Sequence, residues 1–187
     1  EFRRVLFRST AKGCEPEMVF LQNHGVFVAG DAPEDIRRVY TTILDTLQTE
    51  YRQKGIATKL PAAPAPSEDI VRRMTTRLQD SLGEKAAFVF AAGPAKLSKG
   101  PLSPDHIVYA KSFVLFSEPT PEALAAFREK HGYAPQVVSV KEGVFGLGAS
   151  EQIARLALAF ALDGALICRL AEAFGGVLYM DDRARDF

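Results

Sequence analysis

Two short apolar runs stand near the start of the chain, on either side of a polar turn. Residues 17–22 (EMVFLQ) and 25–30 (GVFVAG) are rich in aromatic and β-branched side chains, and they meet at Asn23, His24 and Gly25. Short apolar runs bounded by Asn and Gly are typical of strands and turns. The pattern therefore predicts two strands, or one strand that a turn interrupts.

The next stretch, residues 31–55, has the hydrophobic period of a helix. Its apolar positions recur every three to four residues: Ile36, Val39, Tyr40, Ile43, Leu44, Leu47 and Tyr51. Asp31 is a candidate N-cap, with Pro33 in the first turn and Glu34 three residues further on. Gly55 is a typical residue for the C-terminal end. We expect one long amphipathic helix here.

Residues 58–67 (TKLPAAPAPS) contain three prolines among small residues, which is typical of a semi-stiff linker. The linker separates an N-terminal part, residues 10–57, from a second α/β part, residues 68–187. In the second part the pattern predicts a helix over 68–82, a strand in 86–92, irregular chain over 93–106, a strand around 107–116, a helix over 121–130, a strand in 136–141, a long helix near the C-terminus and an apparent short strand after it.

An internal repeat relates the two parts. Residues 19–36 align with residues 137–153 when one residue near the helix start is omitted. The alignment pairs Val19 with Val137, Gly25 with Gly143, Val26-Phe27 with Val144-Phe145, and Gly30 with Gly148. A long helix follows each copy, so the same strand, turn, strand and helix unit is expected twice. At the position of His24 the second copy has Glu142.

Composition and charge exclude several classes of protein. The 187 residues are 47% hydrophobic and 25% charged, which is ordinary for a globular protein. Lys+Arg and Asp+Glu both total 23, so no net charge draws the chain to nucleic acid or to an anionic membrane. The two cysteines, Cys14 and Cys168, are far apart in the sequence and indicate neither a disulfide framework nor a Cys-rich zinc site. We expect a cytoplasmic protein that does not span a membrane.

The two ends of the chain differ from the rest. Residues 1–9 (EFRRVLFRS) are basic and lack the apolar core of a signal peptide. We interpret them as a non-native junction, the alternative being a basic edge strand. The last residues, YMDDRARDF, directly follow the apparent strand. We therefore expect a fragment of a longer protein.

The segment VFLQNHGVFVAGDAPEDIRRVY, residues 19–40, resembles the C-terminal signature of the class II aldolase/adducin family. The resemblance implies an α/β fold of the class II aldolase type with three layers, α/β/α, in which a truncated first copy precedes a degenerate second copy. It also implies that His24 is the last of three histidines that bind a catalytic zinc ion, and that Asn23 and Gly25 shape the turn. Residues 66–187 resemble the second, aldolase-like half of longer bacterial members.

The resemblance implies a carbon–carbon lyase of carbohydrate metabolism. In such an enzyme zinc stabilises the enediolate that forms when a ketose phosphate is cleaved by a retro-aldol reaction. Homo-oligomers are the family habit, so a homo-oligomeric parent is implied. The other zinc ligands, an H-x-H pair, and the acid/base glutamate precede the His-Gly signature in the family, and neither occurs in the residues before His24. We assign no catalytic residue, and expect this chain alone to be inactive and to retain no zinc.

Two other functions remain open. A non-catalytic binding or assembly module, as in adducin-like members, would keep the fold without the metal site. Alternatively, residues 66–187 would bind a sugar phosphate or a nucleotide as a regulatory domain. Without the family pattern, His24 itself would be interpreted as a structural turn or core histidine.

Several other polar residues are interpreted structurally. The lysines of GPAKLSKG, residues 93–100, lack the spacing of a phosphate-binding loop and indicate a solvated loop. Asp105 and His106 follow Pro104 and fit a turn with Asp as a cap better than a metal pair. His131 fits the C-terminal end of a helix.

Overall fold

A computed structural model describes residues 13 and 15–181, so the expected non-native junction lies outside the described residues. The chain divides into two compact units between Ile56 and Ala57, where the proline-rich stretch begins. Each unit has its own small sheet, and the fold is mixed α/β. Within the described part of the chain, no helix is long and apolar enough to cross a membrane.

The first unit consists of a hairpin and one long helix. Strands β1 (Met18–Leu21) and β2 (Gly25–Val28) pair antiparallel, and α2 spans Pro33–Gln53. The predicted strands and helix are therefore confirmed. The predicted N-cap is wrong by one residue, because Ala32 occupies that position and its backbone N–H donates to Asp35 Oδ2 at 3.3 Å. Asp35, rather than Glu34, supplies the acceptor that this helix end requires.

The first unit buries little apolar surface. Among the described residues of the first unit, Val39 of α2 is the one fully buried hydrophobic residue. Met18 and Phe20 lie on one face of the hairpin and Phe27 on the other, and they are 43%, 64% and 46% exposed. Both faces of this two-stranded sheet are thus apolar and open to solvent. A hairpin of this kind is marginally stable without further strands or a packed helix.

The second unit contains a three-stranded sheet and four α-helices among its described residues. In chain order the elements are α3 (Glu68–Leu82), the 3₁₀ helix η1 (Gly83–Ala86), β3 (Phe88–Ala92), α4 (Pro104–Ala110), α5 (Pro121–His131), β4 (Val137–Val140), β5 (Gly143–Gly148), α6 (Glu151–Ala171) and the 3₁₀ helix η2 (Glu172–Phe174). The helices α3, α5 and α6 and the strands β3 and β4 confirm the sequence prediction. The repeat also predicted β5.

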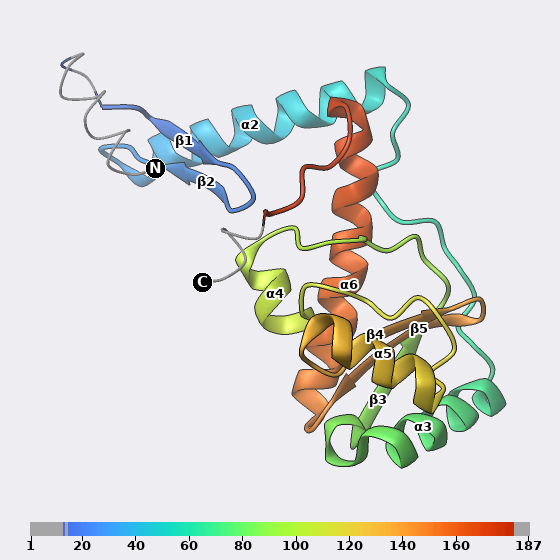
Figure 1. Ribbon diagram of the computed structural model, residues 1–187. Coiled ribbons are helices and arrows are strands. Elements are labelled where there is room, and N and C mark those ends of the chain that lie inside the picture. Colours follow the sequence, from blue (N-terminus) through green and yellow to red (C-terminus); the bar gives the residue numbers. More distant parts are fainter. Residues whose placement is uncertain (1–12, 14, 182–187) are drawn as a thin grey trace. The chain divides into compact units, whose positions relative to one another are not determined.

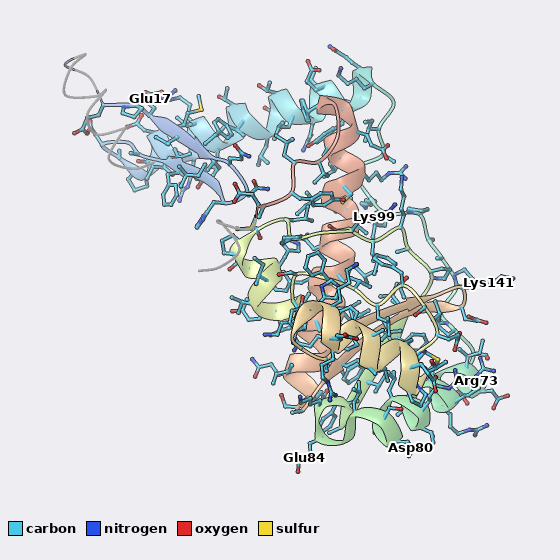
Figure 2. The ribbon with its side chains drawn as sticks, viewed as in Figure 1. Glu17, Arg73, Asp80, Glu84, Lys99 and Lys141 are labelled. Carbon is cyan, nitrogen blue, oxygen red and sulfur yellow. The ribbon has the colours of Figure 1, made fainter. Side chains whose placement is uncertain are left out.

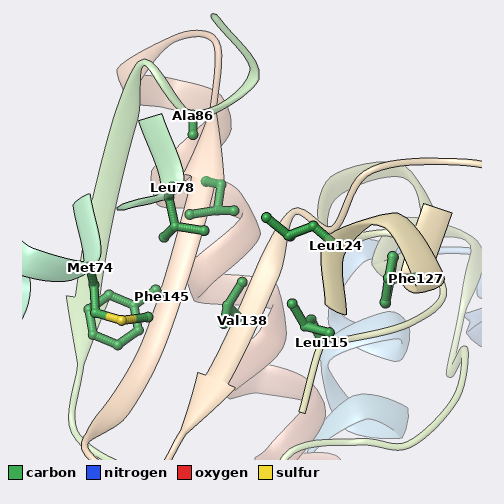
Figure 3. Packing of buried hydrophobic residues seen from close by; sticks show 9 residues of the cluster. Met74, Leu78, Ala86, Leu115, Leu124, Phe127, Val138 and Phe145 are labelled. Atoms are coloured by element: carbon green, nitrogen blue, oxygen red, sulfur yellow. The ribbon is translucent and has the colours of Figure 1, made fainter. Parts of the chain in front are cut away.

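The sheet has the order β3-β5-β4, and every pairing between these strands is antiparallel. Helices cover both of its faces (Figure 1). One face carries a buried cluster with α3 and α5, drawn in Figure 3: Met74, Leu78, Ala86, Leu115, Leu124, Phe127, Val138, Phe145 and Leu147. On the other face Val137 and Val144 pack against alanines of α6 and Ala110 of α4.

Helix α6 lies unusually close to β5, because β5 has glycines where it faces the helix. A Cβ on Gly146 would lie 2.6 Å from Leu158 Cβ and from Ala154 O, and a Cβ on Gly148 would lie 2.5 Å from Ala154 N. The facing positions of α6 are small as well, since Ala154, Ala157 and Ala161 are buried. Small residues on both sides let the helix backbone approach the strand.

Two predicted strands are absent from the described residues. The strand expected around 107–116 is wrong, because residues 104–110 form α4 and Leu115 makes an isolated parallel bridge to Val138. Ser103 caps α4 and Pro104 opens it, and these helix signals override the β-propensity of IVY. The apparent strand near residue 178 is also wrong. Its Met180 N–H makes one hydrogen bond to Pro101 O, at 2.9 Å, and no ladder.

The proline-rich stretch packs against the second unit. Residues 58–67 contain no helix or strand, as expected of a linker. However, a Cβ on Gly93 would lie 2.6 Å from Ala63 O and from Pro64 O, and one on Gly143 would lie 2.6 Å from Pro66 Cγ. The stretch therefore lies directly against the ends of β3 and β5.

Candidate functional site

His24 is the last residue of the turn that joins β1 to β2. Leu21 pairs with Gly25, so the turn consists of Gln22, Asn23 and His24, and the His24 N–H donates to Leu21 O at 3.2 Å. Asn23 has φ 56° and Gly25 has φ 152°. Both values lie where most side chains are strained, and Asn and Gly are the residues that tolerate such conformations best. The two residues therefore fix the turn that presents His24.

The imidazole of His24 is exposed and lies beside Phe27, with 6.4 Å between ring centroids. Among the described residues, no three His, Cys, Asp or Glu side chains come together as metal ligands. A catalytic zinc ion takes three protein ligands and an open position. The residues that the structure describes therefore do not by themselves fit the zinc ion that the resemblance implied.

The corresponding turn of the second unit is one residue shorter. Val140 pairs with Gly143, so Lys141 and Glu142 alone join β4 to β5. When β2 is aligned with β5, Glu142 still matches His24. However, β1 is then displaced by one residue relative to β4. The sequence alignment of Val19 with Val137 is therefore wrong. The extra residue lies in the turn that carries His24, and Glu142 stands half-buried in the shorter turn.

His106 is buried in the second unit and contacts residues of two helices. Its Nδ1 lies 2.7 Å from Ser103 Oγ, which also accepts the His106 backbone N–H at 3.4 Å. Its Nε2 lies 3.4 Å from Asp163 Oδ2 of α6, an ion-pair distance without hydrogen-bond geometry. The ring stands edge-on to Phe160 at 5.4 Å. Ser103 Oγ and His106 Nδ1 are hydrogen-bonded, and the ring tautomer sets which of the two donates.

Burial lowers the pKa of His106 below its usual range, and the carboxylates of Asp163 and Asp105 partly oppose this effect. Ser103, His106 and Asp163 are the residue types of a hydrolytic triad. However, Ser103 Oγ caps α4, and the cavity beside the ring has a volume of about 30 Å³, which holds no more than one water molecule. We assign the three residues to the packing of α4 on α6. Ser103, not Asp105, is the cap of α4, contrary to the sequence interpretation.

His131 is the last residue of α5, where the sequence placed it. Its ring stacks on Phe113 at 4.3 Å and lies 4.6 Å from Phe127. The residue thus belongs to an aromatic cluster at the edge of the core.

One pocket of the second unit has a volume of about 520 Å³, and sequence reasoning assigned no site to the residues that line it. Lys96 and Lys99 line it, and both are exposed on a loop, as the sequence pattern indicated. Cys168 and Arg169 of α6 line it as well. The available signal was the pair of lysines three residues apart after a strand, which is too common to single out a site.

Comparison with protein-family models, with curated proteins and with solved structures finds no match to this chain.

Proposed function

We propose that the first unit is the closing part of a class II aldolase/adducin-type domain, whose intact form is a zinc-dependent lyase acting on a sugar phosphate. The turn at Asn23, His24 and Gly25 carries the proposal. Two residues with positive φ present an exposed imidazole between paired strands. The resemblance assigns this position to the family's zinc-binding histidine. A ligand held on a fixed turn is preorganised for a metal ion.

The repeated unit supports the same proposal. Both copies consist of a hairpin followed by a 21-residue helix, α2 in the first unit and α6 in the second. In the second unit β5 pairs with β4 on one edge and with β3 on the other, and its six positions are buried. In the first unit β2 pairs with β1 alone among the described residues, and apolar side chains remain exposed. We infer that the first unit is completed by a sheet to which its hairpin belongs.

His24 would supply one imidazole, and the described residues do not complete the ligand set. The remaining ligands would come from a segment upstream of the hairpin in the intact protein. No chemical step of this chain is therefore assigned to zinc.

The test requires the native coding sequence that precedes residue 10 in the intact protein, because residues 1–9 are interpreted as a non-native junction. The extended protein is purified and its zinc content is measured per chain, for the wild type, for His24→Ala and for Gln22→Ala. Gln22 is the matched control, because it is an exposed residue of the same turn. We expect about one zinc ion per chain in the wild type and in Gln22→Ala, and a loss of roughly tenfold or more in affinity in His24→Ala.

Either of two results would overturn the proposal. One is an extended protein that holds no zinc, and the other is zinc binding that His24→Ala leaves unchanged. Both would favour the non-catalytic, adducin-like module, which a search for partner proteins would then examine. A zinc-bound protein would next be assayed for retro-aldol cleavage of ketose phosphates.

A further inference from the structure

The 520 Å³ pocket is formed by four segments of the second unit. Leu60, Pro61 and Ala63 come from the proline-rich stretch, and residues 92–97 and Lys99 come from the end of β3 and the loop after it. The C-terminal half of α6 and the segment at Val177 and Tyr179 provide the remaining lining. Pockets of this size that combine apolar walls with a few polar groups are typical of sites for small molecules.

Three cationic side chains line this pocket, and none of them pairs with a carboxylate among the described residues. Lys96 and Lys99 lie on the loop after β3, and Figure 2 labels Lys99 there. Arg169 of α6 is half-buried, and its Nε donates to Ala57 O at 3.1 Å, which fixes the guanidinium group. Glu172 is the one carboxylate among the lining residues. The pocket therefore presents an excess of positive charge.

Cys168 lines the pocket, and Ser98, Tyr179, Lys96 and Glu172 influence the pKa of its thiol. Tyr179 also ties the segment at 177–179 to the loop, because its hydroxyl accepts the Lys99 backbone N–H at 3.4 Å. Residues distant in the sequence thus meet in one defined place.

We propose that this pocket binds a small organic phosphate, with the phosphate group held by Lys96, Lys99 and Arg169. Lysine binds phosphate as a point charge, and arginine offers a planar fork that matches its oxygens. Two lysines and an arginine suit a dianion better than the single charge of a carboxylate. The apolar walls at Leu60 and Leu97 then contact the organic body.

The negative charges at the end of α6 determine where the organic part of the ligand lies. The C-terminal end of α6 carries the negative end of the helix dipole, and Glu172 lies just beyond it. Arg169 offsets this negative charge only in part, so the two lysines of the loop after β3 attract the anion most strongly, whereas a hydroxyl or amino group finds acceptors beside Glu172. The ligand is therefore oriented with its phosphate toward the loop after β3 and a hydroxylated or amino-bearing body toward Glu172. This site is independent of the role proposed for His24, because every lining residue belongs to the second unit.

Cys168 provides a direct reporter of occupancy. The sequence contains two cysteines, so a Cys14→Ser background leaves Cys168 as the one thiol. Its alkylation by N-ethylmaleimide is followed at pH 8.5, with and without the phosphate probes glucose 6-phosphate and AMP at millimolar concentration. Glucose and adenosine are the matched probes without phosphate, and inorganic phosphate is the probe without an organic body. The melting temperature is measured with the same set of probes.

Two variants test the cationic residues. Lys96→Gln combined with Lys99→Gln removes both loop charges, and Lys141→Gln is the control because Lys141 is exposed in the β4–β5 turn, outside the pocket lining (Figure 2). We expect at least one phosphate probe to slow alkylation by fivefold or more and to raise the melting temperature. Both effects should persist in Lys141→Gln. In the double variant the affinity for the phosphate probe should fall at least tenfold.

Four results would overturn the proposal. The first is protection by none of the phosphate probes. The second is equal protection by a phosphate probe and its phosphate-free counterpart, which would indicate an apolar site. The third is protection that the double variant retains. Protection by inorganic phosphate that is equal to that by the organic phosphates would likewise contradict a site built for the body of the ligand.

Discussion

His106 Nε2 of α4 lies 3.4 Å from Asp163 Oδ2 of α6, and the histidine of this pair is buried while the aspartate is half exposed. Burial lowers the pKa of His106, so the folded protein keeps the ring neutral at pH values where the unfolded chain protonates it. The stabilisation is therefore complete above the ordinary histidine pKa, near 6.5, and is lost as pH falls toward the lowered value.

We predict that the free energy of unfolding of the wild type falls between pH 7.5 and pH 5.5, and falls less in His106→Gln. Urea unfolding at the two pH values measures the difference. His24→Gln serves as the control, because that histidine is exposed. A pH dependence that is identical in the wild type and in His106→Gln would contradict the prediction.

Asp163→Asn removes the charge that most favours the protonated ring. The pKa of His106 should fall further, and acid destabilisation should increase. At neutral pH we expect a loss of no more than about 0.5 kcal/mol, because solvent screens a half-exposed carboxylate. NMR titration of the imidazole measures the pKa directly, and an increase in this variant would refute the assignment.

Gly146→Ala should destabilise the second unit by about 1–3 kcal/mol. The new Cβ would lie 2.6 Å from backbone atoms of α6, which cannot move without separating the helix from β5. Gly164→Ala is the contrasting variant, because its Cβ would meet no backbone atom but the Cδ1 end of the Leu102 side chain at 3.2 Å, and alanine favours the helix. In thermal unfolding, Gly146→Ala should melt at a lower temperature than Gly164→Ala. Equal melting temperatures would count against the close packing of α6 on β5.

Phe20→Ser should improve solubility and reduce self-association. Phe20 is 64% exposed on a hairpin whose two faces are both apolar, so its removal shrinks an exposed apolar patch. The cost in stability should stay within about 0.5 kcal/mol. Phe116→Ser, at a 51% exposed position of the second unit, is the control. Light scattering of concentrated samples compares them, and equal behaviour of the wild type and Phe20→Ser would be inconsistent with this account.

Cys168 should react slowly with alkylating reagents at neutral pH. Burial raises the pKa of its thiol, while Ser98, Tyr179 and the Lys96 ammonium group oppose that effect. In the Cys14→Ser background, Lys96→Gln should shift the pH–rate profile of alkylation to higher pH. A shift to lower pH would show that Lys96 does not stabilise the thiolate.

The sequence predicted the long elements because each buries one face with a clear period. Helix α3 begins and ends as predicted, β4 follows from a short apolar run, and β5 follows from the repeat. Element ends were less predictable. Ala32 stands where Asp31 was expected, since a backbone N–H and Asp35 replaced a side-chain cap.

Tertiary context explains the larger errors. The IVY segment of α4 has β-propensity, but Ser103 and Pro104 start a helix before it, and Ala110 then packs in the core against α6. The turn at His24 was visible because its residues are adjacent in the sequence. The pocket was not, since Lys96, Arg169 and Tyr179 come from segments that the fold alone brings together.

The proline-rich stretch defines where the second unit can be cut. Its carbonyl groups at Ala63 and Pro64 touch Gly93, and Leu60 and Pro61 are part of the pocket wall. A recombinant second unit that started at Glu68, as composition suggests, would lose this wall together with the Ala57 carbonyl that orients Arg169. A second unit expressed from Ala57 keeps the pocket wall and the Ala57 carbonyl. The N-terminal boundary for expression therefore lies eleven residues before the first helix of the unit.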